Sequence, residues 1–178
     1  MLKIRYANFA DAETICDIAA RTFYNTYAVY NSQEDMQQYM QESFSIQQIK
    51  SELEDAQSKF LLITENENIL GYAKITWRRK PVNSSDEIAL EIARFYAETI
   101  YIGKGIGKFL MEECISIAKA GAAKYIWLDV WQENKKAIRF YQKWGFIITE
   151  NYSFILGKDV QQDYIMEKRI NELNKSQY

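Results

Sequence analysis

The spacing of apolar residues changes several times along this chain, and each change predicts a different element. Residues 59–65 and 69–77 are rich in strand-forming residues, and the short polar stretch between them predicts a hairpin turn. Strand formers return at residues 87–97. Residues 124–131 form an almost continuous apolar run, which is typical of a strand that is buried on both faces.

Between these stretches, apolar residues recur with a helical period. One such stripe runs through residues 12–23 and should face the core. A second stripe runs through residues 105–120, and we expect Gly121 to end this helix as a left-handed cap. A third helix is expected to begin at Asn134 and to end at Gly145.

Strands therefore alternate with helices along the chain. A short strand at residues 4–6 opens the sequence, and residues 146–157 and 161–170 supply two closing strands. This order predicts an α/β domain that is built around a mixed sheet. We assign residues 1–171 to one domain and residues 172–178 to a polar C-terminal tail.

Residues 31–58 are polar and are predicted to be helical, with Asn31 or Ser32 beginning one helix and Ser45 a second. Six acidic residues accompany a single lysine, Lys50, so this stretch carries a net charge of −5. The acidic residues are Glu34, Asp35, Glu42, Glu52, Glu54 and Asp55. Two interpretations stay open: a solvated helical face, or an acidic wall beside a cationic substrate.

Composition narrows the class of protein. The chain has 178 residues, of which 48% are hydrophobic and 26% are charged, as expected for one globular domain. No apolar run reaches the length of a membrane span, and the first residues lack the apolar core of a signal peptide, so we expect a cytoplasmic protein. With a net charge of −2, the chain lacks the basic footprint of a nucleic-acid-binding domain.

Missing residue types exclude several kinds of chemistry. The chain contains no histidine, which excludes the Ser-His-Asp and Cys-His nucleophile arrangements and histidine-based metal sites. Its two cysteines, Cys16 and Cys114, fall within helical patterns and are expected to be reduced thiols, and their spacing suggests no metal site. Acid–base chemistry near neutral pH must then use carboxylates, Tyr, Lys, Cys, the N-terminus or water.

The stretch IYIGKGIGK at residues 100–108 contains three of the seven glycines. A Walker A loop is excluded because Phe109 stands where that loop has a hydroxyl residue, and a Rossmann loop is disfavoured because the stretch comes late in the chain. A strand ends before it and a helix begins within it, so free N–H groups, the helix dipole, Lys104 and Lys108 favour a bound anion. A strand-to-helix turn without a ligand is the remaining alternative.

Two motifs together resemble the GNAT superfamily of N-acetyltransferases. Residues 102–107, IGKGIG, resemble the Gln/Arg-x-x-Gly-x-Gly/Ala loop that binds acyl-coenzyme A. Residues 134–146, NKKAIRFYQKWGF, are similar to the family's Asn-x-x-Ala-x-x-Phe-Tyr-x-Lys-x-Gly-Phe segment. Residues 21–40 and 150–170 also resemble bacterial spermine/spermidine N-acetyltransferases of the PaiA type, so the resemblance spans most of the chain.

The resemblance implies a GNAT-like α/β fold with a mixed, mostly antiparallel central sheet that is flanked by helices. A V-shaped splay would separate two central parallel strands at residues 87–97 and 124–130. Acetyl-CoA would lie in this cleft as the co-substrate, with its pyrophosphate on backbone amides of the glycine loop, and no metal is implied. The residues expected to bind it are Phe95, Tyr96, Ala97, Ile102, Gly103, Lys104, Gly105, Ile106, Gly107, Lys108, Asn134 and Lys143.

The resemblance also implies catalytic roles. Tyr141 would be the general acid that protonates the departing thiolate, and the reference pKa of a tyrosine, about 10, suits that role. Ala93 stands where related polyamine acetyltransferases carry a Glu that is a proposed base, and Glu91, two residues earlier, is the substitute candidate. Ile102 replaces the family's usual Gln or Arg, which leaves the backbone amides to bind the phosphates.

The leading hypothesis is direct transfer of an acetyl group from acetyl-CoA, in a ternary complex, to a primary amine of a small cationic acceptor such as spermidine or spermine. A protein, peptide or amino-acid N-acetyltransferase is one alternative. A non-catalytic acyl-CoA-binding regulatory module is another, and Ala93 is the residue that keeps it open. Dimers are common among such enzymes, so the resemblance also allows a homodimer.

Overall fold

The computed structural model describes residues 1–81, 83, 86–156 and 159–170. Within these residues, seven strands form one sheet in the order β1-β2-β3-β4-β5-β7-β6. The strands are β1 (Lys3–Tyr6), β2 (Ser58–Glu65), β3 (Asn68–Thr76), β4 (Ala89–Ala97), β5 (Tyr125–Trp131), β6 (Ile147–Leu156) and β7 (Asp159–Arg169). The predicted tail at residues 172–178 lies outside the described residues.

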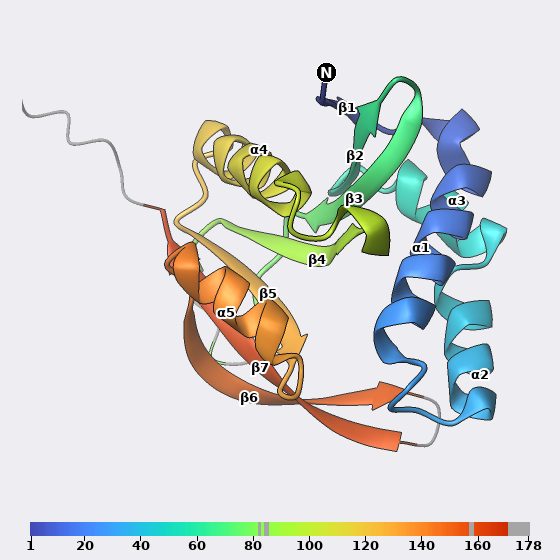
Figure 1. Cartoon of the computed structure of the whole chain (residues 1–178). Helices are drawn as coiled ribbons and strands as arrows, with labels where there is room; N and C mark the ends of the chain where they lie inside the picture. The colour runs from blue at the N-terminus through green and yellow to red at the C-terminus, as the bar shows by residue number, and fades with distance from the viewer. Residues whose placement is uncertain (82, 84–85, 157–158, 171–178) are drawn as a thin grey trace, which may run out of the picture.

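Five α-helices in the described part of the chain cover the two faces of this sheet (Figure 1). They are α1 (Ala12–Tyr27), α2 (Gln33–Ser43), α3 (Ile46–Glu54), α4 (Ile106–Ala120) and α5 (Lys135–Lys143). Side chains alternate along β2, so Phe60 and Leu62 pack with α1, α2 and α3, whereas Leu61 and Ile63 pack in the core of α4 and α5. No described helix is long and apolar enough to cross a membrane.

The centre of the sheet opens between β4 and β5. Among the described strands these are the one parallel pair, and they pair only from Ala89 with Tyr125 to Glu91 with Trp127. Both strands continue beyond that point, β4 to Ala97 and β5 to Trp131. The strands therefore separate toward their C-terminal ends, which confirms the predicted mixed, mostly antiparallel sheet and its V-shaped splay.

A β-bulge in β4 lies where the strands begin to separate. On β3, Lys74 pairs with Arg94 whereas Ile75 pairs with Ile92, so Ala93 has no partner in this ladder. A bulge bends its strand and increases the local twist. The bulge at Ala93 follows the last pair between β4 and β5 and therefore contributes to the splay.

Most predicted helix boundaries are confirmed by their caps. The Ser32 and Ser45 hydroxyl oxygens accept hydrogen bonds from backbone N–H groups in the first turns of α2 and α3, at 3.1 and 3.3 Å. The Asn134 side chain accepts a hydrogen bond from the N–H of Ala137 at 3.1 Å and caps α5. Gly145 ends that helix in a left-handed conformation, with φ +82°.

The predicted left-handed cap at Gly121 is wrong. Gly121 has φ −87°, and the left-handed position falls on the next residue, Ala122, with φ +55°. A Cβ atom at Gly121 would overlap the ring of Trp77. Close approach of the Trp77 side chain, rather than backbone conformation, therefore requires glycine at this helix end.

Candidate active site

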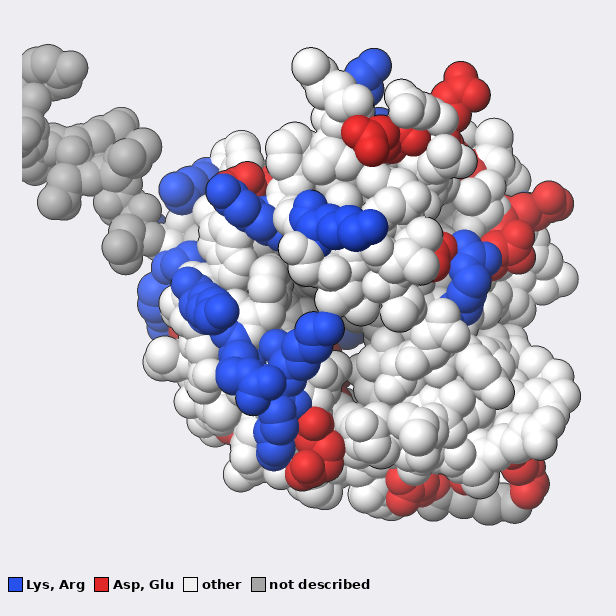
Figure 2. Space-filling model, in the orientation of Figure 1, with Lys and Arg blue, Asp and Glu red and all other residues white. Residues whose placement is uncertain are grey.

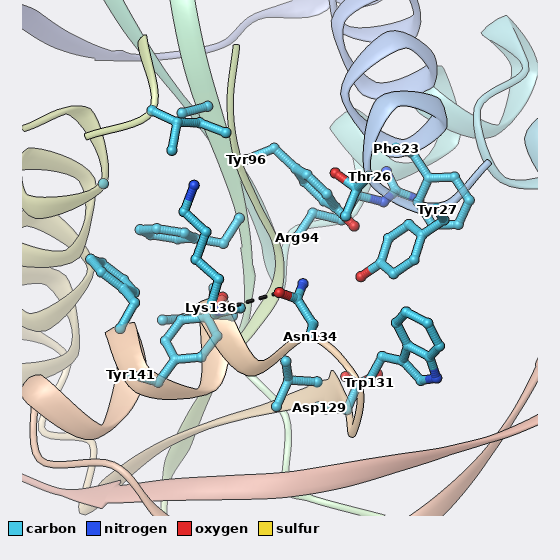
Figure 3. A pocket seen from close by; sticks show the side chains of 18 of the residues that line it. Phe23, Thr26, Tyr27, Arg94, Tyr96, Asp129, Trp131, Asn134, Lys136 and Tyr141 are labelled. Atoms are coloured by element: carbon cyan, nitrogen blue, oxygen red, sulfur yellow. Dashed lines mark hydrogen bonds between the residues drawn. The ribbon is translucent and has the colours of Figure 1, made fainter. Parts of the chain in front are cut away.

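A cavity of about 750 Å³ opens where β4 and β5 separate (Figure 3). Its walls come from the C-terminal halves of β4 and β5, from α1 and α5, from the turn between β4 and α4, and from β6 and β7. The lining combines the glycine turn, cationic residues, aromatic residues and two aspartates.

The turn between β4 and α4 presents backbone N–H groups to the cavity. Gly103 and Gly105 have φ values of +84° and +89°, a left-handed conformation that other residues adopt with difficulty. A Cβ atom at either position would meet nothing within 4 Å, so conformation rather than crowding requires glycine there. Gly107 lies in the first turn of α4, where N–H groups have no acceptor within the helix. This turn is therefore suited to bind an anion.

Among the described residues, four of the five cationic side chains that line the cavity come from α4 and α5, and the fifth is Arg94 on β4. The four on the helices can act near the turn. They are Lys108, Lys136, Arg139 and Lys143. Figure 2 shows Lys and Arg side chains gathered over α5 and the start of α4. The Lys136 side chain extends from α5 across the cavity in Figure 3. These residues supply positive potential for a ligand that carries phosphate groups.

Two of the predicted cofactor residues, Lys104 and Ile106, do not line the cavity. The Lys104 ammonium group lies 5.3 Å from the centre of the Tyr101 ring, and its backbone N–H donates to the Tyr101 carbonyl oxygen at 3.1 Å. Ile106 is buried in the core beneath α4. The other predicted cofactor residues do line it: Phe95, Tyr96, Ala97, Ile102, Gly103, Gly105, Gly107, Lys108, Asn134 and Lys143.

Tyr141 lines the cavity from α5. Its ring packs against Phe95, Phe140 and Phe146, with ring centroids between 5.4 and 6.1 Å apart. Burial of this 7% exposed side chain raises the pKa of its hydroxyl well above the usual range, and nearby ionisable groups add to the effect. The hydroxyl therefore keeps its proton at neutral pH and is available as a donor.

Glu91, the candidate base, does not reach the cavity. It lies opposite Trp127 in the part of β4 that is still paired with β5, before the strands separate. Its carboxylate is 1% exposed and accepts a hydrogen bond from the Arg78 guanidinium at 2.5 Å. Burial raises the pKa of Glu91, and the Arg78 charge opposes that shift. Ala93 does line the cavity but has no ionisable group.

Two aspartates in the cavity wall were missed by the sequence analysis. Asp129 projects from β5 two residues before Trp131, so their side chains share a face of the sheet. Trp131 lies opposite Asp163 in the antiparallel pairing with β7, which brings the Asp163 side chain to the same face. Both carboxylates line the cavity.

The environment of these aspartates favours their protonated forms. Burial raises the pKa of Asp163 to about 7, and the neighbouring Asp129 carboxylate adds to the shift. Burial also raises the pKa of Asp129, which the more distant Arg78 charge partly offsets. Asp163 is only 5% exposed, and its Oδ1 has no hydrogen-bond partner among the described residues. The pair therefore contains a polar atom that a ligand could satisfy.

Part of this site was readable from the sequence. Asp129 is the one charged residue within residues 125–131, an otherwise apolar run, and a carboxylate in a buried strand is uncommon unless it has a role. Asp163 offered no such signal, because its strand contains several charged residues and its position depends on the register with β5.

Aromatic rings surround the space next to the aspartates. Tyr27 on α1 lies 6.0 Å from Trp131 and 4.6 Å from Phe23, measured between ring centroids. Burial raises the pKa of the Tyr27 hydroxyl to about 12, although hydrogen bonds with Tyr96 and Asn134 oppose the shift. In Figure 3 the Tyr27 hydroxyl points toward Asn134. This region combines aromatic faces with carboxylates, which together suit an organic cation.

The predicted acidic wall at residues 31–58 does not form. None of its six acidic residues lines the cavity. Glu52 is buried, but its carboxylate binds Arg94 in two hydrogen bonds of 2.7 and 3.0 Å and also pairs with Lys74 at 3.0 Å. Most of the others are exposed to solvent. The interpretation as a solvated face is therefore correct for most of the segment, while Glu52 anchors the cavity residue Arg94.

The described residues contain no group of three or more His, Cys, Asp or Glu side chains that could hold a metal ion. Both cysteines are free thiols, with Cys114 buried and Cys16 partly buried. Burial raises the pKa of Cys114 to about 12, so this thiol stays protonated and inert at neutral pH.

Comparisons with known proteins agree with the motifs. The family model described as Acetyltransferase (GNAT) family matches residues 13–146. An uncharacterized N-acetyltransferase in the pepI 3′ region of Lactobacillus delbrueckii subsp. lactis is 27% identical over 169 residues, which cover 95% of this chain and 98% of that protein. The spermidine N(1)-acetyltransferase of Thermoplasma acidophilum is 26% identical over 172 residues, which cover 94% of this chain and 97% of that protein.

The similarity extends to a solved structure. The PaiA N-acetyltransferase from Thermoplasma acidophilum, in complex with coenzyme A, matches this fold with a TM-score of 0.78 and 25% sequence identity. The match covers 96% of this chain and 99% of that one. The similarity therefore extends over nearly the whole chain and is not limited to a local motif.

Proposed function

Because the chain belongs to the GNAT acetyltransferase family and is an acetyl-CoA-dependent N-acetyltransferase, we propose that its acceptor is a primary amine of a small cationic molecule. The observation that carries this proposal is the carboxylate pair of Asp129 and Asp163 in the wall of the cavity that also contains the glycine turn. Spermidine or spermine is the acceptor that we favour. The similarity to the spermidine N(1)-acetyltransferase of Thermoplasma acidophilum supports this choice.

The glycine turn fits the pyrophosphate of coenzyme A. The left-handed glycines keep side chains away from the amides of Gly103, Gly105 and Gly107. Helix N-termini bind phosphates through such amides and through the helix dipole. Lys108 on α4 and Lys143 on α5 also line the cavity, where they can pair with phosphate oxygens.

The free edge of β4 fits the amide-containing arm of coenzyme A. Beyond Glu91, β4 has no partner on its β5 side. The backbone groups around Phe95, Tyr96 and Ala97 are thus available to pair with an extended ligand, as a sheet edge pairs with another strand. The Asn134 carboxamide faces this space from the opposite wall.

The region of Asp129 and Asp163 fits the acceptor. Two carboxylates attract an ammonium group, and the rings of Tyr27 and Trp131 offer aromatic faces to a cation or to its methylene chain. A neutral or anionic acceptor would leave the carboxylates without a partner. The cavity chemistry therefore favours a positively charged amine.

The transfer itself needs a nucleophile and a proton donor. The thioester supplies an activated acetyl group when acetyl-CoA is bound. The neutral amine nitrogen of the acceptor attacks the carbonyl carbon, the C–N bond forms and the C–S bond breaks. The Tyr141 hydroxyl, which keeps its proton at neutral pH, donates that proton to the departing thiolate. No covalent enzyme intermediate is required.

A panel of acceptors tests this proposal. Purified protein is incubated with acetyl-CoA and with spermidine, spermine, butylamine, free amino acids or short peptides, and acetylated products are measured by mass spectrometry. We expect kcat/KM for spermidine or spermine to exceed that for the amino acids and peptides by at least roughly tenfold, equivalent to about 1.4 kcal/mol of discrimination. Faster acetylation of peptides or amino acids would refute the cationic small-molecule acceptor.

A further inference from the structure

Asp129 and Asp163 form a carboxylate pair whose role goes beyond attracting a cation. They come from neighbouring strands, and the register between β5 and β7 brings both side chains to one face. Asp163 is 5% exposed, and its Oδ1 has no hydrogen-bond partner among the described residues. Among those residues, no Lys or Arg forms an ion pair with either carboxylate. The pair therefore lines the cavity and holds a buried acceptor atom without a partner in the described part of the chain.

The reaction leaves one proton without an acceptor. A primary alkyl amine has a pKa near that of lysine, about 10.4, so only about one molecule in a few thousand is neutral at pH 7. Glu91 is bound to Arg78 outside the cavity, and Ala93 has no ionisable side chain. A carboxylate base within the cavity therefore comes from another part of its wall.

We propose that Asp129 and Asp163 act together as the proton acceptor, with Asp163 removing the proton from the acceptor ammonium group before its nitrogen attacks the thioester. This step rests on the proposed function, because it needs a cationic amine in the cavity. The general base would then be supplied by β5 and β7. On β4, the corresponding position is Ala93, which has no carboxylate.

The proton balance of this step is complete. The ammonium group and the Asp163 carboxylate become a neutral amine and a carboxylic acid. After the amine has attacked, its second proton leaves to solvent as the amide forms, and the thiolate receives a proton from Tyr141. Solvent returns a proton to Tyr141 and takes one from Asp163. The net products are the acetamide, coenzyme A as its thiol, and one released proton.

The surroundings of the pair suit a base that works near neutral pH. The titratable or charged groups that face it are Tyr27 on α1, Tyr39 on α2, Glu91 on β4, Tyr141 on α5, Tyr152 on β6 and Arg78 after β3. Tyr27, Tyr39 and Tyr141 keep their protons at pH 7, and the Arg78 charge is paired with the Glu91 carboxylate. Two adjacent carboxylates with so little compensation hold one proton between them, and Asp163 titrates at about pH 7.

Three variants test the proposal against wild type in pH profiles of kcat/KM with spermidine. Asp163→Asn and Asp129→Asn remove one carboxylate each with little change in shape. Asp17→Asn is the matched control, because Asp17 is exposed on α1 and does not line the cavity. For wild type and for Asp17→Asn, we expect kcat/KM to rise about tenfold per pH unit below pH 7 and to be constant above pH 7.

Asp163→Asn should differ from wild type in both its turnover rate and its pH profile. Its kcat should fall at least about 100-fold at pH 7, the size of a general-base contribution. Its kcat/KM should rise continuously to pH 9 without the bend near pH 7, because it now depends on the fraction of free amine. Binding of acetyl-CoA, measured by calorimetry, should remain within about threefold of wild type. A bend that stays at pH 7 together with a kcat loss below about threefold would overturn the proposal.

Two outcomes separate this step from the proposed function. If wild type acetylates no amine, the proposed function fails and this step fails with it. If wild type acetylates spermidine and Asp163→Asn does so equally well, this step alone fails.

A second measurement uses wild type only and does not depend on the folding of a variant. Aspartate carboxyl carbons are labelled with ¹³C and titrated by NMR with and without spermidine. We expect one carboxyl to titrate near pH 7 and its midpoint to move to lower pH when spermidine is added, because a bound ammonium favours the ionised form. Titration of all aspartates below pH 5, with no response to spermidine, would contradict the pair.

Discussion

At the scale of single residues, burial of the Asp163 carboxylate makes folding less favourable as pH rises. Its pKa is raised to about 7 in the folded protein and is about 3.9 in an unfolded chain. Below about pH 4 both states hold the proton. Between about pH 4 and pH 7 only the folded state holds it, so stability falls as pH rises, and above about pH 7 the full loss is present.

Asp163→Asn should therefore be more stable than wild type at high pH. The variant cannot ionise, so its melting temperature should exceed that of wild type at pH 8 by at least about 2 °C, which corresponds to about 1 kcal/mol for a domain of this size. At pH 4.5 the difference should shrink. Thermal unfolding followed by circular dichroism at both pH values measures it, and a difference that does not change with pH would contradict the buried-carboxylate account.

Tyr141 is the second residue with a distinct prediction. Tyr141→Phe removes the hydroxyl and keeps the ring that packs against Phe95, Phe140 and Phe146. We expect kcat to fall about 100-fold, the usual size of a general-acid contribution, with little change in acetyl-CoA binding. Steady-state kinetics and calorimetry measure the two effects.

Tyr6→Phe is the control for Tyr141→Phe, because Tyr6 is exposed on β1 and does not line the cavity. Its kinetics should match wild type. An unchanged kcat in Tyr141→Phe would remove this hydroxyl from the role of proton donor.

At the scale of secondary structure, the turn between β4 and α4 depends on left-handed glycines. Gly105 has φ +89° with open space around a Cβ position, so substitution acts through backbone strain and not through a clash. Alanine in this conformation costs about 1 kcal/mol, and asparagine costs less. We expect Gly105→Ala to weaken acetyl-CoA binding by about fivefold and Gly105→Asn to weaken it less.

Calorimetric titration of acetyl-CoA into the two Gly105 variants and wild type gives the order of affinities. We expect wild type to bind acetyl-CoA most tightly, Gly105→Asn less tightly and Gly105→Ala least tightly. Wild-type affinity in Gly105→Ala would show that the conformation of this turn does not matter for the phosphates.

Local sequence was sufficient to predict where several helices begin. Periodicity and capping residues predicted the helices that begin after Ser32, Ser45 and Asn134, because these signals lie within a few neighbouring residues. The cap at Gly121 was predicted wrongly because the reason for glycine is the ring of Trp77, more than forty residues away in the chain. Contacts between distant segments are invisible to a local pattern.

At the scale of the whole molecule, the fold and the glycine turn that lines the cavity could be predicted from two motifs, whereas the carboxylate pair in its wall could not. The glycine loop and the segment at residues 134–146 are contiguous in sequence. The acceptor region joins Tyr27, Asp129 and Asp163 from three distant segments, and Asp163 reaches it only through the register of β7 with β5. Glu91 does not line the cavity, because it lies on the paired side of the splay.

The charges that line the cavity also predict how binding responds to salt. Four of the five cationic side chains that line the cavity in the described residues come from α4 and α5, beside the glycine turn, so affinity for acetyl-CoA should fall as ionic strength rises. Lys143→Gln should weaken binding by roughly fivefold, about 1 kcal/mol, and should reduce the salt dependence. Lys59 is exposed on β2, so Lys59→Gln should change neither the affinity for acetyl-CoA nor its salt dependence. Salt-independent affinity in wild type would contradict the phosphate assignment.

The central claim is that one cavity holds coenzyme A and a cationic amine end to end. A crystal structure of the protein with coenzyme A and spermidine, an unreactive pair, tests it most directly. The account predicts the pyrophosphate on the amides of Gly103, Gly105 and Gly107, and an ammonium group within hydrogen-bonding distance of Asp163 that points toward the thiol. Spermidine bound outside this cavity, or coenzyme A away from the glycine turn, would contradict it.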